Sequence, residues 1–186
     1  MILILSIIPL CSKKKFYFIR HGETSYNQEK RYTGLHDISL NSTGKQQIRN
    51  VLPQLEDKNI SCIYTSPLKR AFESSYIISK HLDIPIIILD KLKERDFGYL
   101  QGKKKLNYKK RFFPNGQTLY EHRRDTLRAF NQIKLQNNIL IVAHSGTYKA
   151  LVKHLLNVTL SSRLDNAKLV CFYHDESRLW NTKQNF

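Results

Sequence analysis

Short apolar runs alternate with longer segments of helical character along this chain, and this alternation limits its fold more than any other feature. The runs are rich in β-branched and aromatic residues, as β-strands are. The expected strands lie at 16–20, 60–66, 84–90, 137–146 and 167–174. The expected helices lie at 41–57, 67–82, 117–136 and 146–156. We therefore predict an α/β fold, a three-layer α/β/α sandwich with a mostly parallel central sheet.

Local features refine several of these elements. Ser42 or Thr43 is the expected N-cap of the first helix, and Pro53 should kink or shorten its end. Pro67 suits the first turn of the second helix. The segment 84–90 is apolar throughout, which is typical of a strand covered on both faces.

Length and composition favour a single domain. The chain has 186 residues, of which 41% are hydrophobic, enough for one real core. We place the domain at 13–186 and treat 1–12 as an apolar N-terminal extension outside the core. The roughly ten apolar residues there are too few to cross a bilayer, which takes about 20. Lysines 13–15 follow this stretch, whereas a secretory signal carries its charge before it. A membrane-leaning anchor helped by these lysines is the alternative.

The cysteines and the charge indicate the compartment and the partners. The cysteines, Cys11, Cys62 and Cys171, are odd in number and widely spaced, so we expect neither a disulfide framework nor a zinc site. We therefore expect a cytoplasmic location, where cysteines stay reduced. The 31 Lys and Arg residues outnumber the 15 Asp and Glu residues, which gives a net charge of +16. Such a charge favours an anionic partner, meaning a phosphorylated substrate, nucleic acid or an acidic membrane. A general bias toward Lys, Asn and Ile explains it equally well.

Polar residues follow three of the expected strands. The first expected strand ends in Arg20 and His21, and the fourth ends in His144. The second ends in the small polar residues 65–66, and Arg70 follows one turn into the next helix. Ligands bind beyond the carboxyl ends of the strands in such sheets. Arginines offer donors suited to phosphate oxygens, and an imidazole among them can act as a nucleophile, a metal ligand or an acid/base. Metal binding fits poorly, because arginines repel a cation and no carboxylate or cysteine stands at ligand spacing near either histidine.

Four motifs in this order resemble the histidine phosphatase superfamily, also called the phosphoglycerate mutase-like family. They are RHGETSYN, SPLKRA, LKERDFGYLQG and AHSG, and the resemblance runs from Lys15 to about Trp180. It implies that His21 is the nucleophile that takes the phosphoryl group, and that Glu94 protonates the leaving oxygen. The residues that it implies for phosphate and substrate binding are Arg20, Asn27, Thr33, Gly34, Arg70 and His144. It requires no cofactor and no metal.

Physical chemistry supports these roles independently. Fixed cations stabilise the charge that spreads over the phosphoryl oxygens, and they also favour the neutral, nucleophilic form of His21. Gly22 is expected to let the backbone approach the phosphate. Asp96 is an alternative acid, although a role in capping a loop explains it better.

Several other polar residues have structural explanations. Thr24 and Ser25 suit loop capping, and 36–37 suit a structural turn. His122 and His174 match no position of the family pattern and are expected at the surface.

The short domain resembles the phosphatase branch, since the mutases of the family carry inserted segments. We expect a phosphomonoester hydrolase that uses a phosphohistidine intermediate. A phosphoglycerate mutase-type phosphotransferase and a non-catalytic anion- or nucleic-acid-binding module are the alternatives.

The segment 102–125 carries basic clusters at 103–105, 109–111 and 123–124. They suit a substrate with a second anionic group, or simply a solvated loop. Tyr108, Phe112 and Phe113 lie between basic residues, as base stacking on nucleic acid would need.

Overall fold

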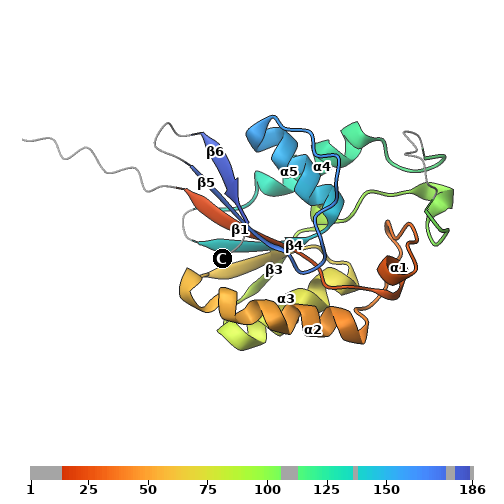
Figure 1. Cartoon of the computed structure of the whole chain (residues 1–186). Helices are drawn as coiled ribbons and strands as arrows, with labels where there is room; N and C mark the ends of the chain where they lie inside the picture. The colour runs from red at the N-terminus through yellow and green to blue at the C-terminus, as the bar shows by residue number, and fades with distance from the viewer. Residues whose placement is uncertain (1–13, 106–112, 136–137, 175–178, 185–186) are drawn as a thin grey trace, which may run out of the picture.

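A six-stranded sheet lies at the centre of the molecule (Figure 1). The computed structural model describes residues 14–105, 113–135, 138–174 and 179–184. Within them the strand order is β3-β2-β4-β1-β5-β6. The strands are β1 Lys15–Arg20, β2 Cys62–Thr65, β3 Ile86–Ile88, β4 Ile139–Ala143, β5 Leu169–His174 and β6 Trp180–Lys183. The pairs β3-β2, β2-β4 and β4-β1 are parallel, whereas β5 runs antiparallel to both β1 and β6.

Helices cover both faces of this sheet. The helices are α1 Ser25–Gln28, α2 Ser42–Val51, α3 Lys69–Leu82, α4 Leu119–Phe130 and α5 Ser145–Leu156. In Figure 1, α2 and α3 lie on one side of the sheet and α4 and α5 on the other. The predicted three-layer α/β/α architecture with a mostly parallel sheet is therefore confirmed.

Strand β1 joins two separate hydrophobic cores. Phe16 and Phe18 pack toward the α4 and α5 layer, whereas Tyr17 and Ile19 pack toward α2 and α3. This alternation follows from the period of two along a strand. Each such side chain stabilises the fold by about 1.5–3 kcal/mol when fully buried. Because it is anchored on both faces, β1 holds the residues that follow it in fixed positions.

The ends of the helices differ from the sequence expectations. The N-cap of α2 is Asn41, whose side chain accepts from the amide of Gly44 at 2.7 Å, rather than Ser42 or Thr43. Pro53 lies in a 3₁₀ turn directly after α2, so it shortens the helix as expected. Pro67 precedes α3, which begins at Lys69, and α4 covers only the central part of 117–136.

The edges of the sheet were the weakest part of the prediction. Strand β3 is an edge strand, and Ile87 and Ile88 are 40% and 52% exposed, so the expectation that 84–90 is covered on both faces is wrong. Strand β6 was not predicted at all, because its sequence is mostly polar.

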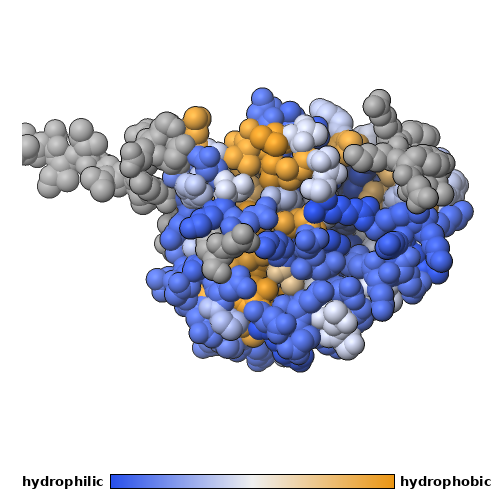
Figure 2. All heavy atoms as spheres, viewed as in Figure 1, coloured by the Kyte–Doolittle hydropathy of each residue, from blue (hydrophilic) through white to orange (hydrophobic). Residues whose placement is uncertain are grey.

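The visible surface is mostly hydrophilic, and apolar side chains gather over α5 in the upper part of the view in Figure 2. No helix among the described residues is long and apolar enough to span a bilayer. The proposed extension 1–12 lies outside the described residues.

Candidate active site

The polar ends of β1, β4 and β2 meet at one edge of the sheet. The register pairs Arg20 with Ala143, so the residues that follow, His21 and His144, emerge side by side. The amide of His21 donates to the carbonyl of Ala143 at 3.0 Å, and the two imidazole centroids are 5.2 Å apart. Ser66, after β2, lies with its Oγ 2.9 Å from His144 Nε2. The parallel register thus brings together residues that lie far apart in the sequence.

The environment of His21 fixes its tautomer. Its Nδ1 lies 2.7 Å from the carbonyl oxygen of Gly22, which can only accept a hydrogen bond, so Nδ1 carries the proton. Nε2 therefore keeps its lone pair. Burial lowers the pKa of His21 well below its usual value, and the charges of Arg70 and Arg20 lower it further. The ring is neutral at physiological pH, as a nucleophile must be.

His144 lies next to His21 and is fully buried. Burial, followed by the charge of Arg70, lowers its pKa well below the usual range. Its Nδ1 is buried and has no hydrogen-bond partner among the described residues. The ring is thus a neutral, buried group, and one of its two ring nitrogens has no partner in the described part of the chain.

Arg20 and Arg70 are held by backbone carbonyls rather than by carboxylates. Arg20 Nη1 donates to Leu164 at 2.6 Å, whereas Arg70 Nη1 and Nη2 donate to His36 and Gly34, both at 2.8 Å. Burial lowers the pKa of each guanidinium to about 10, so both remain cationic near neutral pH. Since neutral groups orient them, their positive charge is preserved for an anion. The bond to His36 also supports the expectation that 36–37 form a structural turn.

The loop after His21 packs tightly against α2. A Cβ at Gly22 would overlap the backbone of Gly44, and a Cβ at Gly44 would overlap the backbone of Glu23. The amide of Gly22 donates to Ser74 Oγ at 3.1 Å. Contact with α2 is therefore a physical reason for a glycine at position 22, in addition to the approach to phosphate that the sequence suggested. Thr24 caps α1, as expected.

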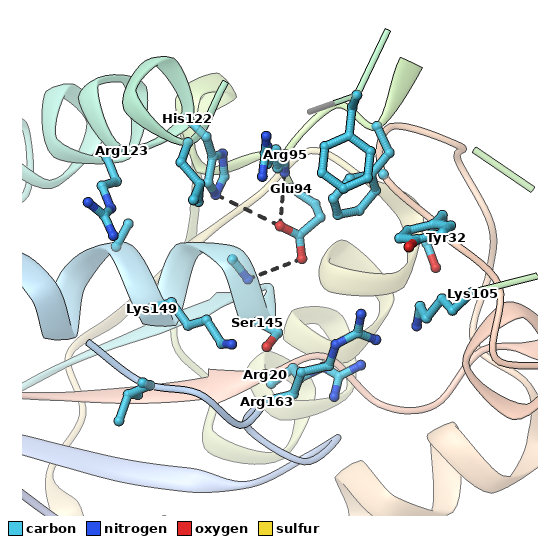
Figure 3. Close-up of a pocket in the computed structure, with 18 of the residues that line it drawn as sticks. Arg20, Tyr32, Glu94, Arg95, Lys105, His122, Arg123, Ser145, Lys149 and Arg163 are labelled. Carbon is cyan, nitrogen blue, oxygen red and sulfur yellow. Dashed lines mark hydrogen bonds and ion pairs between the residues drawn. The ribbon is translucent and has the colours of Figure 1, made fainter. Parts of the chain in front are cut away.

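Two backbone amides hold the Glu94 carboxylate. Arg95 donates to Oε1 at 2.9 Å and Gly146 donates to Oε2 at 3.2 Å (Figure 3). The alternative acid, Asp96, accepts from the amide of Gly98 at 2.7 Å, which is the loop-capping role.

His122 is not a surface residue. It comes from α4, is 3% exposed, and its Nε2 lies 3.8 Å from Glu94 Oε1. Burial lowers the pKa of His122, although the charge of Glu94 opposes this effect. The sequence expectation is wrong because the apolar packing of α4 against α5 places this helix face inside the molecule.

A pocket of about 450 Å³ opens at this edge of the sheet. Seven of the eight predicted site residues line it, and the eighth, His144, is buried next to His21. The lining residues from the sequence prediction are Arg20, His21, Asn27, Thr33, Gly34, Arg70 and Glu94. Of the expected basic clusters, Lys105 and Arg123 line the pocket, whereas 109–111 lie outside the described residues.

The segment before β5 contributes to the site, which the sequence did not indicate. Asn166 Nδ2 donates to the carbonyl of His21 at 2.9 Å and to Asn27 Oδ1 at 3.1 Å. The amide of Ala167 donates to the carbonyl of Arg20 at 2.9 Å. This segment ties down the backbone of the histidine. No motif reveals it, because its contacts join residues that lie far apart in the sequence.

Phe113 is 5% exposed and packs against Tyr32 and Phe97 at centroid distances of 5.7 and 4.9 Å. The guanidinium of Arg95 lies 4.6 Å from its ring centroid. The ring is therefore buried among these side chains, and it is not available to stack on a base. Tyr108 and Phe112, which the nucleic-acid alternative also needs, lie outside the described residues.

Comparison with known families agrees with this geometry. The sequence pattern described as "Histidine phosphatase superfamily (branch 1)" matches residues 16–185. The chain belongs to the histidine phosphatase superfamily. It is therefore an enzyme of a family that contains phosphatases and mutases, as the motifs implied.

Individual relatives in this superfamily are named as phosphatases or as mutases. The chain is 36% identical over 161 residues to the "uncharacterized phosphatase PhoE" of Bacillus subtilis, covering 81% of this chain and 83% of that protein. It is 30% identical over 203 residues to a 2,3-bisphosphoglycerate-dependent phosphoglycerate mutase of Buchnera aphidicola, covering 82% and 88%.

Solved structures of the superfamily share the fold. Bacillus stearothermophilus YhfR superposes with a TM-score of 0.79 at 23% identity, covering 92% of this chain and 96% of the other. A phosphoserine phosphatase of Entamoeba histolytica, solved in complex with 3-phosphoglyceric acid, superposes with a TM-score of 0.77 at 25% identity and the same coverage.

Proposed function

We propose that this protein hydrolyses the phosphomonoester of a small metabolite through a phosphohistidine intermediate on His21. The observation that carries the proposal is the hydrogen bond between His21 Nδ1 and the carbonyl of Gly22 at 2.7 Å. It commits the ring proton to Nδ1 and leaves the lone pair of Nε2 for attack on phosphorus. Because burial and two arginines lower the pKa of His21, the nucleophile is available at neutral pH.

The reaction proceeds in two in-line transfers. Nε2 of His21 forms a bond to phosphorus while the bond to the leaving oxygen breaks, and Glu94 donates a proton to that oxygen. Water then attacks the phosphohistidine, Glu94 accepts the proton of the water, and the N–P bond breaks to release phosphate.

Fixed donors stabilise the transferring group. Arg20 and Arg70 stabilise the charge on the phosphoryl oxygens, and Asn27, Thr33 and Gly34 complete the binding surface. His144, the other residue predicted to bind phosphate, is buried beside His21 and does not line the pocket. Each step is supported by side chains of this chain, without a metal or an organic cofactor.

A mutase is the second candidate, and the relative of Buchnera aphidicola named as a phosphoglycerate mutase favours it. A mutase returns the phosphoryl group to a hydroxyl of the substrate, whereas a phosphatase passes it to water. Assays with phosphoglycerate, with and without catalytic bisphosphoglycerate, separate the two. Release of inorganic phosphate without interconversion of phosphoglycerates supports the phosphatase.

The decisive experiment uses an aryl phosphate with wild type and His21→Ala. We expect wild type to release phosphate with or without a chelator, and His21→Ala to be inactive. A rapid alkaline quench during turnover of ³²P-labelled substrate should trap the phosphohistidine, which acid would hydrolyse. Wild type that is inactive on a broad panel of phosphomonoesters would refute catalysis and leave the anion-binding alternative. Turnover without a trapped phosphoenzyme would refute the covalent route.

A further inference from the structure

His122 lines the pocket, and the reaction proposed above gives it no role. Its side chain is 3% exposed, and its Nε2 is buried without a hydrogen-bond partner among the residues that the structure describes. A buried polar atom that makes no hydrogen bond destabilises a fold, so native proteins contain few of them. The position of this ring therefore requires an explanation in the chemistry of the site.

Helix α4 fixes the position of His122. The helix begins with a capping box, in which Thr118 and Glu121 each bond the backbone of the other. His122, Thr126 and Phe130 follow at intervals of four residues and are all buried, so they lie on one inward face of the helix. An apolar side chain would fill this place without leaving an unpaired nitrogen. Packing alone therefore does not explain the imidazole.

The Nε2 atom of His122 faces Oε1 of Glu94 at a distance of 3.8 Å (Figure 3). This distance exceeds that of a hydrogen bond by about 1 Å, and the hydrogen bonds of catalytic groups often tighten only in the complex with substrate. Gly146 leaves the space beside both atoms free, because a Cβ there would overlap Oε1 and crowd Nε2. A small movement of the ring is therefore enough to form the bond.

The protonation of His122 determines which atom donates. Burial is the main cause that lowers the pKa of His122, and the charge of Arg95 adds to it. Glu94, the backbone of Gly146 and Asp125 oppose this shift without reversing it. The ring is therefore neutral near physiological pH and carries one N–H. An ionised carboxylate can only accept hydrogen bonds, so the tautomer that pairs with it has its proton on Nε2.

Glu94 is ionised during one part of the proposed cycle. It has then given its proton to the leaving oxygen and has not yet accepted the proton of the attacking water. We propose that His122 is a positioning residue that donates from Nε2 to Oε1 of Glu94 at this stage and holds the carboxylate in place as the base. The proposal rests on the phosphatase function above and deepens it.

His122 is the adjustable member of three donors around this carboxylate. The backbone amides of Arg95 and Gly146 hold one oxygen each, at 2.9 and 3.2 Å. These two donors belong to the main chain, whereas the ring of His122 can approach Oε1 when Glu94 becomes negative. A hydrogen bond to the ionised form of a carboxyl group favours that form. His122 therefore acts through Glu94 in the second half of the reaction, the hydrolysis of the phosphohistidine.

The test measures the two halves of the reaction separately. Rapid mixing with a ³²P-labelled aryl phosphate, followed by an alkaline quench, gives the rate constant for formation of the phosphoenzyme. This step needs little help from an acid, because the aryl leaving group departs without a proton. A chase with unlabelled substrate then gives the rate constant for hydrolysis of the phosphoenzyme, which needs the base. Both constants describe the folded fraction alone, so partial unfolding of a variant does not affect them.

His122→Gln and His122→Met are a matched pair of variants. Both new side chains are unbranched and have similar helix propensities, but only glutamine keeps an N–H donor at the ε position. We expect His122→Met to slow hydrolysis of the phosphoenzyme by at least about tenfold, the value of one hydrogen bond to a charged group. Its formation from the aryl phosphate should be unchanged. His122→Gln should keep most of the wild-type rate in both steps.

The pH dependence of phosphoenzyme hydrolysis is a second readout. Without the donor the carboxylate is less stabilised, so hydrolysis by His122→Met should require a higher pH than hydrolysis by wild type. His122→Gln should keep the wild-type profile. The cations whose charges interact with Glu94 are the same in wild type and in both variants; they are Arg20, Arg70, Arg95 and Lys105.

A measurement on wild type decides the point even if His122→Met does not fold. At about pH 8, where carboxyl groups are ordinarily ionised, ¹⁵N NMR of the histidine rings should show the proton of His122 on Nε2. The ring signals that are missing from the spectrum of His122→Gln identify those of His122.

A proton on Nδ1 of His122 at this pH would overturn the proposal. Wild-type hydrolysis of the phosphoenzyme by His122→Met would also overturn it. An equal loss in the Gln and Met variants, or equal slowing of formation and hydrolysis, would mean that the ring has only a structural role. Absence of any phosphoenzyme in wild type would instead refute the proposed phosphatase mechanism, so the two failures are distinguishable.

Discussion

Glu94 has room in the site because residue 146 has no side chain. A Cβ at Gly146 would overlap Glu94 Oε1 and would also crowd His122 Nε2. The same glycine donates its amide to Glu94 Oε2. One residue at the start of α5 therefore both orients the proposed acid and leaves the space that it occupies.

Gly146→Ala should therefore impair proton donation more than phosphoryl binding. We expect kcat for an alkyl phosphate, whose leaving oxygen needs a proton, to fall by about 100-fold, within the usual contribution of general acid catalysis. An aryl phosphate, whose leaving group departs without a proton, should lose less than about tenfold. Steady-state kinetics with both substrates measures the difference, and the aryl substrate serves as the internal control. An equal loss on both substrates would contradict the role of Glu94 as the acid.

At the scale of elements, α2 supports the site without lining the pocket. Gly44 lies in its first turn, in contact with the backbone of Gly22 and Glu23. Asn41 accepts from the amide of Gly44 and donates to Glu23 Oε1 at 2.8 Å. The start of α2 is thus packed directly against the loop that follows His21.

Gly44→Ala should reverse the usual effect of alanine in a helix. Alanine normally stabilises a helix by about 1 kcal/mol relative to glycine. Here its methyl group would displace the loop, so we expect a lower Tm and a loss of kcat/KM of at least about tenfold, the effect of misplacing a catalytic group. Thermal melting and aryl phosphate kinetics check both effects. Lys45→Ala, at the exposed neighbouring position of the same helix, is the control and should change neither.

The parts of the fold that sequence could predict are those with a local signal. The apolar runs before His21 and His144 and the polar residues that end them indicated the strands and the mouth of the pocket. The edge position of β3 could not be predicted, because strand order depends on packing across the whole sheet. His122 and Asn166 were missed for a similar reason: tertiary contacts, not sequence neighbours, bring them to the site.

At the scale of the whole molecule, the site buries three histidines around its centre. His21, His122 and His144 are each at most 3% exposed, and burial is the main cause of the lowered pKa of each. Arg70 and Arg20 lower the pKa of His21 and His144 further, whereas Glu94 and Asp125 oppose the shift at His122. Folding therefore requires three neutral imidazoles.

This requirement makes stability depend on pH with a definite sign. Below about pH 6.5 an unfolded chain protonates these histidines, whereas the folded chain does not until the pH falls to their lowered pKa values. The unfolded state thus binds more protons, and the free energy of unfolding decreases on acidification from pH 6.5. Each histidine contributes a slope of up to about 1.4 kcal/mol per pH unit.

We expect the free energy of unfolding, measured by urea titration, to fall steadily between pH 6.5 and pH 5. His122→Gln should reduce this slope by up to about 1.4 kcal/mol per pH unit, because one of the three buried groups is removed. His154→Gln, at an exposed position on α5, is the matched control and should keep the wild-type slope. Equal slopes for wild type and His122→Gln would mean that His122 takes up a proton in the folded state. Its Nε2, 3.8 Å from Glu94 Oε1, would then form an ion pair with that carboxylate, and the neutral site described above would be wrong at this residue.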